Sequence, residues 1–137
     1  MKALSKKVLE FEDVLRQMPN QLDLTDTTLH FFADGVYLRT LIIPADCVVT
    51  GKIHRTRHLT IIASGTCRIT TDEGVMEVTG PSVFVSEPGA KKAVYTVTQC
   101  VIMNPHPTDE TDLEKIEEQF IAPSFEALEQ DNVERLT

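Results

Sequence analysis

Between residues 28 and 104, short β-prone runs alternate with turn residues, and no helical pattern interrupts them. The runs are rich in Val, Ile, Thr, Tyr and Phe, which fit a pleated strand. The predicted strands are residues 28–33, 36–43, 46–50, 52–54, 58–63, 66–71, 75–79, 82–86 and 92–103. Breaks between them include Asp34-Gly35, Gly51, Gly80-Pro81 and Glu87-Pro88-Gly89. Many short strands with no helix between them indicate a β-barrel or a β-sandwich.

Helical patterns flank this β region on both sides. Residues 4–18 carry apolar side chains at helical spacing, and Pro19 ends the run. We expect this helix to pack on the barrel or on a neighbouring subunit. Beyond the strands, Thr111-Asp-Leu-Glu114 has the pattern of a capping box and predicts a second helix, which Pro123 stops. Residues 124–135 predict a shorter third helix.

The chain has 137 residues, which suits one domain with a single core. We therefore expect a mainly β fold, a single small barrel with an N-terminal helix and a C-terminal helical tail. The expected parts are residues 1–27 (helix and linker), 28–106 (barrel) and 107–137 (helical segment).

Several features bear on the cellular compartment. No apolar run approaches the ~20 residues that span a bilayer, and the N-terminus lacks the apolar core of a signal peptide. Cys47, Cys67 and Cys100 form no C-x-x-C pair, so we read them as reduced thiols. Together these features predict a cytoplasmic protein that binds no membrane.

The net charge of −8 is unevenly distributed along the chain. Residues 36–98 hold seven basic and five acidic side chains, so the β region is slightly positive within an acidic molecule. The acidic flanks would repel a phosphate backbone, which argues against binding of polymeric nucleic acid. Binding of a small anion in a local basic pocket remains an open alternative.

Candidate pocket residues come from two places. In the strand at 36–43, Tyr37 and Arg39 share one face, which would show both to a cavity; the alternative is a solvated Arg39 on the outer surface. His54 and His58 stand four residues apart among cationic side chains. They are not on a helix, so they converge only if barrel strands point them inward. His30, beside two phenylalanines, reads as a structural histidine.

The β region resembles the cupin family. The first cupin motif places a glycine before a His-x-His pair, then a glutamate and a second glycine; here Gly51 and Gly65 keep that frame. The second motif runs from a glycine through a strand to Pro-x-Gly and a histidine, and Gly80 and Gly89 match it. The resemblance implies a jelly-roll barrel with an internal pocket.

Further stretches are similar to a group of small cupin-like proteins encoded by tailed bacteriophages. They cover roughly residues 28–123 and include the C-terminal helix. The matching stretches are Phe32-Ala-Asp-Gly-Val-Tyr37-Leu-Arg39, Gly51-Lys-Ile-His, Ser86-Glu-Pro-Gly-Ala-Lys-Lys and Asp109-Glu-Thr-Asp-Leu-Glu-Lys-Ile-Glu. This resemblance implies the cytoplasm of an infected host cell and no particular activity.

In metal-binding cupins, three histidines and a glutamate hold a divalent ion. The corresponding positions here are Lys52, His54, His58 and Lys92. A protonated lysine has no lone pair, so two of the four ligands are lost. His106, just after the last strand, is the candidate third ligand for a metal such as Zn, Fe, Ni, Cu or Mn.

Three functions remain open at this stage. The favoured one is binding of a small, anionic molecule, which in a phage setting includes a nucleotide-like host signal. Its expected binding residues are Tyr37, Arg39, Lys52, His54, His58 and Lys92.

The second is a metal-dependent isomerase, lyase or hydrolase that uses His54 and His58. The third is a non-catalytic structural or assembly protein. The cupin resemblance also implies a homo-oligomer, with residues 4–18 and the Phe120-Ile121 face as contact surfaces.

Overall fold

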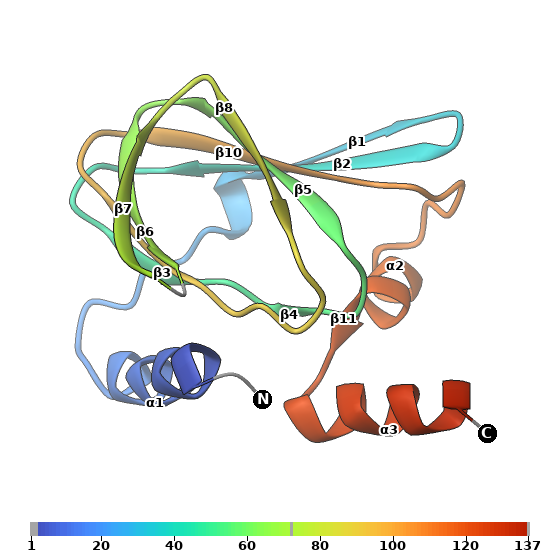
Figure 1. Ribbon diagram of the computed structural model, residues 1–137. Helices are drawn as coiled ribbons and strands as arrows, with labels where there is room; N and C mark the ends of the chain where they lie inside the picture. Colours follow the sequence, from blue (N-terminus) through green and yellow to red (C-terminus); the bar gives the residue numbers. More distant parts are fainter. Residues whose placement is uncertain (1–2, 72, 137) are drawn as a thin grey trace.

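Two antiparallel sheets face each other and form a barrel (Figure 1). The computed structural model describes residues 3–71 and 73–136, with side chains for residues 4–71 and 73–131. One sheet has the order β1 (Thr28–Ala33), β2 (Val36–Ile43), β10 (Cys100–His106), β5 (His58–Ser64) and β8 (Ser82–Ser86). The other has the order β3 (Val48–Thr50), β9 (Ala93–Thr96), β6 (Thr66–Thr71) and β7 (Gly74–Thr79). A short pair, β4 (Ile53–His54) with β11 (Ile121–Ala122), lies at the barrel opening.

The hydrophobic core fills the closed end of the barrel, between the two sheets. Its buried members are Ile43, Ile62, Cys67, Ile69, Val78, Cys100 and Ile102. The mainly β fold with flanking helices is as the sequence predicted. The cysteines are all free thiols, and burial raises the pKa of Cys67 to about 11.

The turn between β5 and β6 shows why Gly65 is needed. Its φ of +91° lies in the region that side chains disfavour, and a Cβ there would sit 2.2 Å from the carbonyl oxygen of Gln99. Its own carbonyl accepts a hydrogen bond from the Gly80 amide at 2.9 Å. The absence of a side chain at Gly65 therefore allows the end of β5 to lie close to β10.

The prediction of one strand at 92–103 is wrong, because the chain forms two strands there. The chain forms β9, leaves the four-stranded sheet at Val97, and enters the five-stranded sheet as β10. The amides of Val97 and Thr98 both donate to the carbonyl of Thr66, which turns the chain between the sheets. β10 then continues to His106, and this places that histidine inside the barrel mouth.

The predicted capping box at Thr111 is one residue off. The N-cap of α2 (Leu113–Phe120) is Asp112, whose carboxylate accepts from the amides of Glu114 and Lys115. The helix also ends at Phe120, before Pro123, because the chain becomes the strand β11. Nothing in the sequence pattern indicated β11, which depends on pairing with β4.

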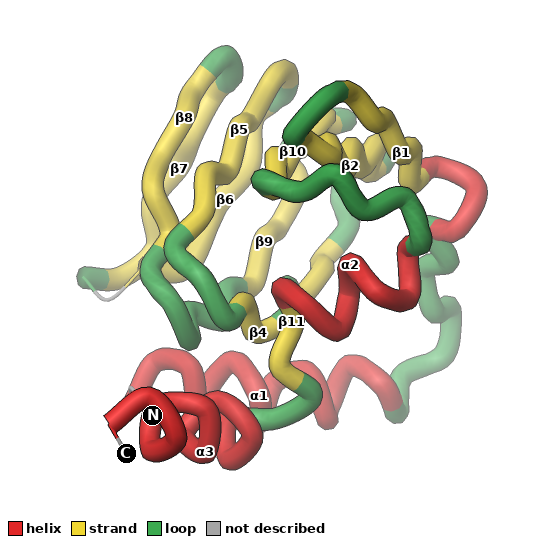
Figure 2. The backbone as a smooth tube through the Cα atoms, turned by 90° about the vertical axis from the view of Figure 1, so that its right-hand side faces the viewer, coloured by secondary structure: helices red, strands yellow, loops and turns green. Residues whose placement is uncertain are grey.

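The helices α1 (Ala3–Arg16) and α3 (Phe125–Leu136) lie below the barrel, and α2 lies beside its opening (Figures 1 and 2). Leu9 and Leu128 pack against the buried cluster of Ile53, Ala122 and Phe125. None of the helices within the described residues has the length and apolar composition needed to cross a membrane.

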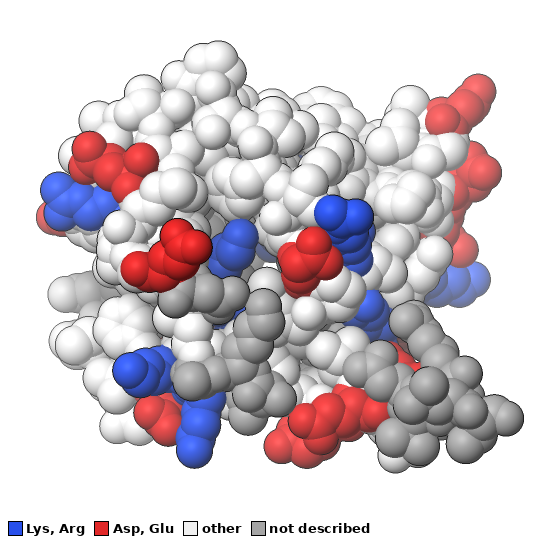
Figure 3. Space-filling model, viewed as in Figure 1, with Lys and Arg blue, Asp and Glu red and all other residues white. Residues whose placement is uncertain are grey.

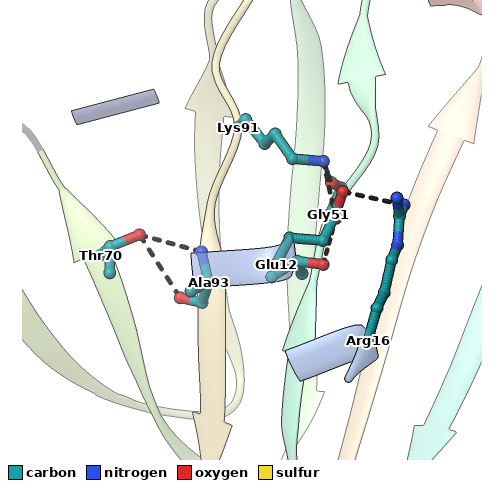
Figure 4. Close-up of polar contacts among 7 residues, drawn as sticks. Glu12, Arg16, Gly51, Thr70, Lys91 and Ala93 are labelled. Atoms are coloured by element: carbon teal, nitrogen blue, oxygen red, sulfur yellow. Dashed lines mark hydrogen bonds and ion pairs between the residues drawn. The ribbon is translucent and has the colours of Figure 1, made fainter. Parts of the chain in front are cut away.

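A buried ion pair fixes α1 to the barrel. The Lys91 ammonium lies 2.9 Å from the Glu12 carboxylate and donates to the carbonyl of Gly51 at 2.8 Å (Figure 4). Burial alone would raise the pKa of Glu12, but hydrogen bonds from Lys91 and Thr50 hold it below its usual value. The N-terminal helix therefore packs on its own barrel, one of the two arrangements predicted for it.

Lys91→Met should lower the free energy of unfolding by about 2 kcal/mol, because the nearly buried Glu12 carboxylate would lose its main partner. Urea denaturation at pH 7 measures this change. The control is Arg57→Met, which removes an exposed ion pair with Glu87 and should cost less than about 1 kcal/mol. Equal losses in the two variants would contradict the structural role of the buried pair.

Candidate functional site

The four histidines of the chain lie in one row with Tyr37. Ring centroids are 5.9 Å apart for His30 and Tyr37, and 5.9 Å for Tyr37 and His106. The row continues from His106 to His54 at 5.7 Å, and from His54 to His58 at 3.8 Å. Successive ring planes differ by only 15° to 26°. We call these five side chains the ring row.

Strand register produces most of this row. β2 and β10 pair so that Tyr37 is opposite His106 and Arg39 is opposite Asn104. On the other edge of β2, His30 is opposite Arg39. Alternate residues of a strand point to the same face, so these side chains all face the barrel interior. The predicted inward face for Tyr37 and Arg39 is confirmed, and the alternative of a solvated outer Arg39 is wrong.

The ring row borders two connected hollows. The outer chamber has a volume of about 290 Å³ and lies between the barrel mouth and α2. Its walls include His30, Tyr37, Arg39, Lys52, His54, His106, Ile116, Glu117 and Phe120. The inner chamber, of about 200 Å³, reaches into the barrel. Its walls include Arg39, Lys52, His54, His58, Thr60, Ser86, Lys92 and Asn104.

The histidines of the mouth are neutral at physiological pH. Burial, with help from His58 and His106, lowers the pKa of His54 from 6.5 to about 3. Burial, His58 and Arg39 lower the pKa of His106 to about 4. Burial also lowers the pKa of His58, while a hydrogen bond from its Nδ1 to the carbonyl of Thr56 opposes the shift.

His106 has an unsatisfied atom. The residue is only 4% exposed, and its Nδ1 atom is buried with no hydrogen-bond partner. A buried polar atom without a partner costs about 1–3 kcal/mol. Other atoms of His106 border the outer chamber, but this nitrogen is closed off from it by the packing around the ring.

A chain of hydrogen bonds runs along the wall of the inner chamber. The Asn104 amide donates to Thr60 Oγ1 at 3.2 Å, Thr60 lies 3.3 Å from Ser86 Oγ, and Lys92 Nζ donates to Ser86 at 3.1 Å. Lys92 also lies over the Phe84 ring, 4.4 Å from its centroid. This places the ammonium of Lys92 at the inner chamber, as the sequence predicted.

Arg39 differs from most basic residues of the barrel. Five others pair with carboxylates: Lys52 with Glu117, Arg55 with Asp131, Arg57 with Glu87, Arg68 with Glu77, and Lys91 with Glu12. Arg39 is half-buried and lines both chambers. Among the residues that the structure describes, none forms an ion pair or a hydrogen bond with its guanidinium. Its charge faces the hollow without a counter-ion.

Lys52 is less central than predicted. Its side chain is 49% exposed at the edge of both chambers, and its ammonium lies 2.5 Å from the Glu117 carboxylate of α2. Its position at the first cupin histidine therefore does not make it an interior residue. Instead it connects the barrel to α2 across the mouth.

Of three comparisons with known proteins, only the one with solved structures finds similar folds. No protein-family model matches the chain, and no curated protein matches it. The cupin domain of Cnp3 from Schizosaccharomyces pombe is similar with a TM-score of 0.50 at 12% identity, over 67% of this chain and 69% of that one. A protein of unknown function from Vibrio parahaemolyticus gives 0.51 at 9% identity, over 57% and 83%. A cupin-2 domain protein from Shewanella frigidimarina gives 0.49 at 15%, over 77% and 100%.

The chain has the cupin fold. The two facing sheets and the pocket between them agree with the cupin resemblance seen in the sequence. The resemblance to phage proteins stays a prediction, since these comparisons concern the fold alone.

His54, His58 and His106 are the candidate metal ligands from the sequence, and their rings as arranged here do not point to a shared ion. The His54 and His58 rings lie face to face, and imidazole lone pairs lie in the ring plane. Stacked rings therefore direct their lone pairs along near-parallel lines rather than to a shared point about 2 Å from each nitrogen. Within the described part of the chain, no group of three or more His, Cys, Asp or Glu side chains could hold an ion.

The structure brings the predicted pocket residues together around the two chambers, and it adds others. His30, expected to be structural, borders the outer chamber and bonds the Tyr37 hydroxyl through Nδ1 at 2.7 Å. Thr60 and Asn104 were missed, although strand alternation places both on the inner face. Glu117 was missed because its position depends on how α2 docks.

Phe120, predicted to form a contact surface with another subunit, is only 4% exposed and packs against Tyr37 and Ile116 within the chain. The prediction of an exposed Phe120 face is therefore wrong. Its ring instead lies 4.7 Å from that of His106 and closes one side of the outer chamber.

Acid should destabilise this protein below pH 6.5. The folded-state pKa values of His54 and His106 lie below 6.5, so the unfolded chain binds protons first as the pH falls. The free energy of unfolding should fall by up to ~1.4 kcal/mol per pH unit for each such histidine.

Urea denaturation between pH 7.5 and pH 5 measures this slope. His54→Asn should reduce it by about one histidine's share, because Asn has no proton to gain in this range. An unchanged slope in the variant would contradict a neutral, buried His54.

Proposed function

We propose that this cupin binds a small anionic molecule in the two connected chambers. The observation that carries the proposal is Arg39, a half-buried guanidinium that lines both chambers without a carboxylate partner. A partly desolvated cation without a counter-ion binds a carboxylate or phosphate strongly, often through two parallel hydrogen bonds. Lys92, at the far end of the inner chamber, adds a second positive charge. A nucleotide-like signal, suggested by the phage resemblance, belongs to this anionic class.

Binding is a better account of the histidines than catalysis. A general base works best with a pKa near the operating pH, and the pKa values of His54 and His106 are about 3 and 4. The thiols of Cys67 and Cys100 offer no alternative nucleophile, because burial raises the pKa of both. The neutral imidazoles instead supply hydrogen-bonding atoms around the guanidinium.

Arg39→Gln should weaken anion binding by roughly 10- to 100-fold, because it removes the charged, two-pronged donor. Thermal shift and calorimetry with inorganic phosphate, succinate and uridine monophosphate measure this change. The matched control is Arg68→Gln, which removes an exposed arginine paired with Glu77 on the other sheet.

The protein is first dialysed against a chelator. Binding that persists after chelation and depends on Arg39 supports the proposal, and binding that returns only with added Zn or Fe favours the metal-dependent alternative. If no anion in the panel binds to the wild-type protein, the proposal is wrong.

We also propose that two copies of the chain associate through the outer face of the five-stranded sheet. That face carries no charged residue along β1, β2, β10, β5 and β8. Its residues are Leu29, Phe31, Val36, Leu38, Thr40, Ile42, Val101, Met103, Pro105, Leu59, Ile61, Val83 and Val85. Figure 3 shows it as the white top of the molecule, with charged side chains below and to the sides.

A second copy is the partner that this face suits. Phe31 and Val83 are 52% and 60% exposed on a surface that spans five strands. At ~4.8 Å per strand and ~3.3 Å per residue the face measures on the order of 500 Å², near the lower end of stable interfaces. Two acidic chains repel each other least when they meet through an uncharged surface, and sheets pack well face to face.

Val83→Lys should convert a dimer into a monomer, because it would bury a charge within the apolar contact. Sedimentation velocity should give about twice the 15.3 kDa chain mass for the wild type and the chain mass for the variant. The control is Val75→Lys, at a valine that is 69% exposed on β7 of the other sheet. A wild type that sediments as a monomer at every concentration tested would contradict this interface.

A further inference from the structure

We propose that the ligand is a small aliphatic acid with a hydroxyl group beside its anionic group, and that it binds in the inner chamber. Its carboxylate or phosphate lies on Arg39, and its hydroxyl donates to the side chain of Asn104 or His58. This inference rests on the proposed anion-binding function and adds the chemical class of the ligand. It follows from two acceptor atoms in the chamber wall, from their accessibility and from the apolar side chains beyond them.

The first acceptor is the amide oxygen of Asn104. The NH2 group of this side chain donates to the carbonyl of Leu59 at 3.1 Å and to Thr60 Oγ1 at 3.2 Å. A backbone carbonyl only accepts, so the nitrogen end of the amide lies at Leu59 and Oδ1 remains as an acceptor. Asn104 is opposite Arg39 on paired strands, and the Cβ atoms of such pairs lie about 5 Å apart. The Asn104 and Arg39 side chains are therefore neighbours on the inner face.

The second acceptor is Nε2 of His58. The Nδ1 atom of this ring lies 3.1 Å from the carbonyl of Thr56, which only accepts, so Nδ1 carries the proton. Burial lowers the pKa of His58, so the ring is neutral at pH 7 and Nε2 has a lone pair without a proton. The His54 ring, stacked on it at 3.8 Å, limits its rotation. The wall thus offers two acceptors, which a hydroxyl group can satisfy and a methyl group cannot.

Both acceptor atoms are accessible. Among the residues that the structure describes, the buried side-chain nitrogen and oxygen atoms without a hydrogen bond are Thr40 Oγ1 and His106 Nδ1 alone. Asn104 Oδ1 and His58 Nε2 form no hydrogen bond within the same residues, so each of them keeps exposed surface. Both side chains line the inner chamber together with the half-buried Arg39. One small molecule can therefore contact the guanidinium and an acceptor at the same time.

The deeper part of the inner chamber is apolar. Leu41 follows Arg39 by two residues on β2, and Ile102 precedes Asn104 by two residues on β10, so these side chains share the inner face. Leu41, Ile102 and Val94 line the chamber and pack with the core. A hydroxyl buried among them would lack a partner, at a cost of about 1–3 kcal/mol. The chamber, at about 200 Å³, therefore suits a small acid with an aliphatic end.

Matched probes test the ligand class by calorimetry. In the carboxylate set, α-methylbutyrate replaces the hydroxyl of α-hydroxybutyrate by a methyl group, and glycerate replaces its terminal methyl group by a hydroxyl. In the phosphate set, β-hydroxybutyl phosphate, β-methylbutyl phosphate and α-glycerophosphate are related in the same way. In at least one set we expect the hydroxybutyl member to bind about five- to tenfold tighter than the methyl member and about threefold tighter than the glycerol-derived one. The set that shows this order distinguishes a carboxylate ligand from a phosphate ligand.

The outcomes separate this inference from the proposed function. If the hydroxybutyl and methyl members bind equally in both sets and Arg39→Gln weakens them, the inference is overturned and anion binding stands. The inference is also overturned if the glycerol-derived members bind as tightly as the hydroxybutyl ones, or if none of the six probes binds, whatever other anions bind. If the hydroxybutyl probes bind and Arg39→Gln leaves their affinity unchanged, the anion-binding function itself is overturned.

Asn104→Leu and His58→Phe test the acceptors, because each keeps the approximate size of the side chain and removes the acceptor atom. In at least one variant the preference for the hydroxybutyl probe over its methyl partner should fall below about twofold, while the methyl partner binds as it does to the wild type. An unchanged preference in both variants would overturn the role of these atoms.

A nitrogen-detected NMR spectrum of the wild-type protein provides a second measurement that needs no variant. The hydroxybutyl probe should shift the signal of His58 Nε2 or of the Asn104 side-chain amide more than its methyl partner does. Equal shifts from the two probes at both residues would contradict a hydrogen bond from the ligand hydroxyl.

Discussion

The antiparallel pairing of β2 with β10 is the contact on which the site depends. Its register sets Tyr37 opposite His106 and Arg39 opposite Asn104, and these four side chains all face the interior. A slip of one residue would turn them to the outer surface and bring the apolar outer residues inward. The core at the closed end holds the register, because Ile43 and Cys100 are opposite each other there and fully buried.

The closed end and the open end of the barrel bury different kinds of side chain. At the closed end, apolar side chains pack together and polar atoms are few. At the open end, imidazoles and a guanidinium share a partly desolvated space, and the pKa values of His54 and His106 fall because a charged ring would be poorly solvated beside Arg39. The result is a mouth in which the Arg39 guanidinium lies among neutral hydrogen-bonding rings, the environment on which the proposed binding of an anion rests.

Much of the barrel could be predicted because each strand carries its own signals. β1, β2, β6 and β8 have the predicted bounds, since β-branched runs end there at glycine, proline or acidic turns. The errors fall where a contact distant in sequence decides the local structure. The strand at 92–103 divides because Thr66 binds the amides of Val97 and Thr98, and β11 exists only because β4 is beside it.

The sequence by itself determined the β-rich barrel, its flanking helices and the shared face of Tyr37 and Arg39, because turn chemistry and period-two alternation are local properties. It also supplied His54, His58, Lys92 and His106 as pocket residues. Only the tertiary structure decided which charges stay without a partner and how the rings face one another. Lys52 is paired with Glu117, whereas Arg39 has no carboxylate partner among the described residues. The rings of His54 and His58, the predicted metal pair, lie stacked against each other. Those properties depend on where separate strands and α2 meet, and residue spacing along the chain does not encode that.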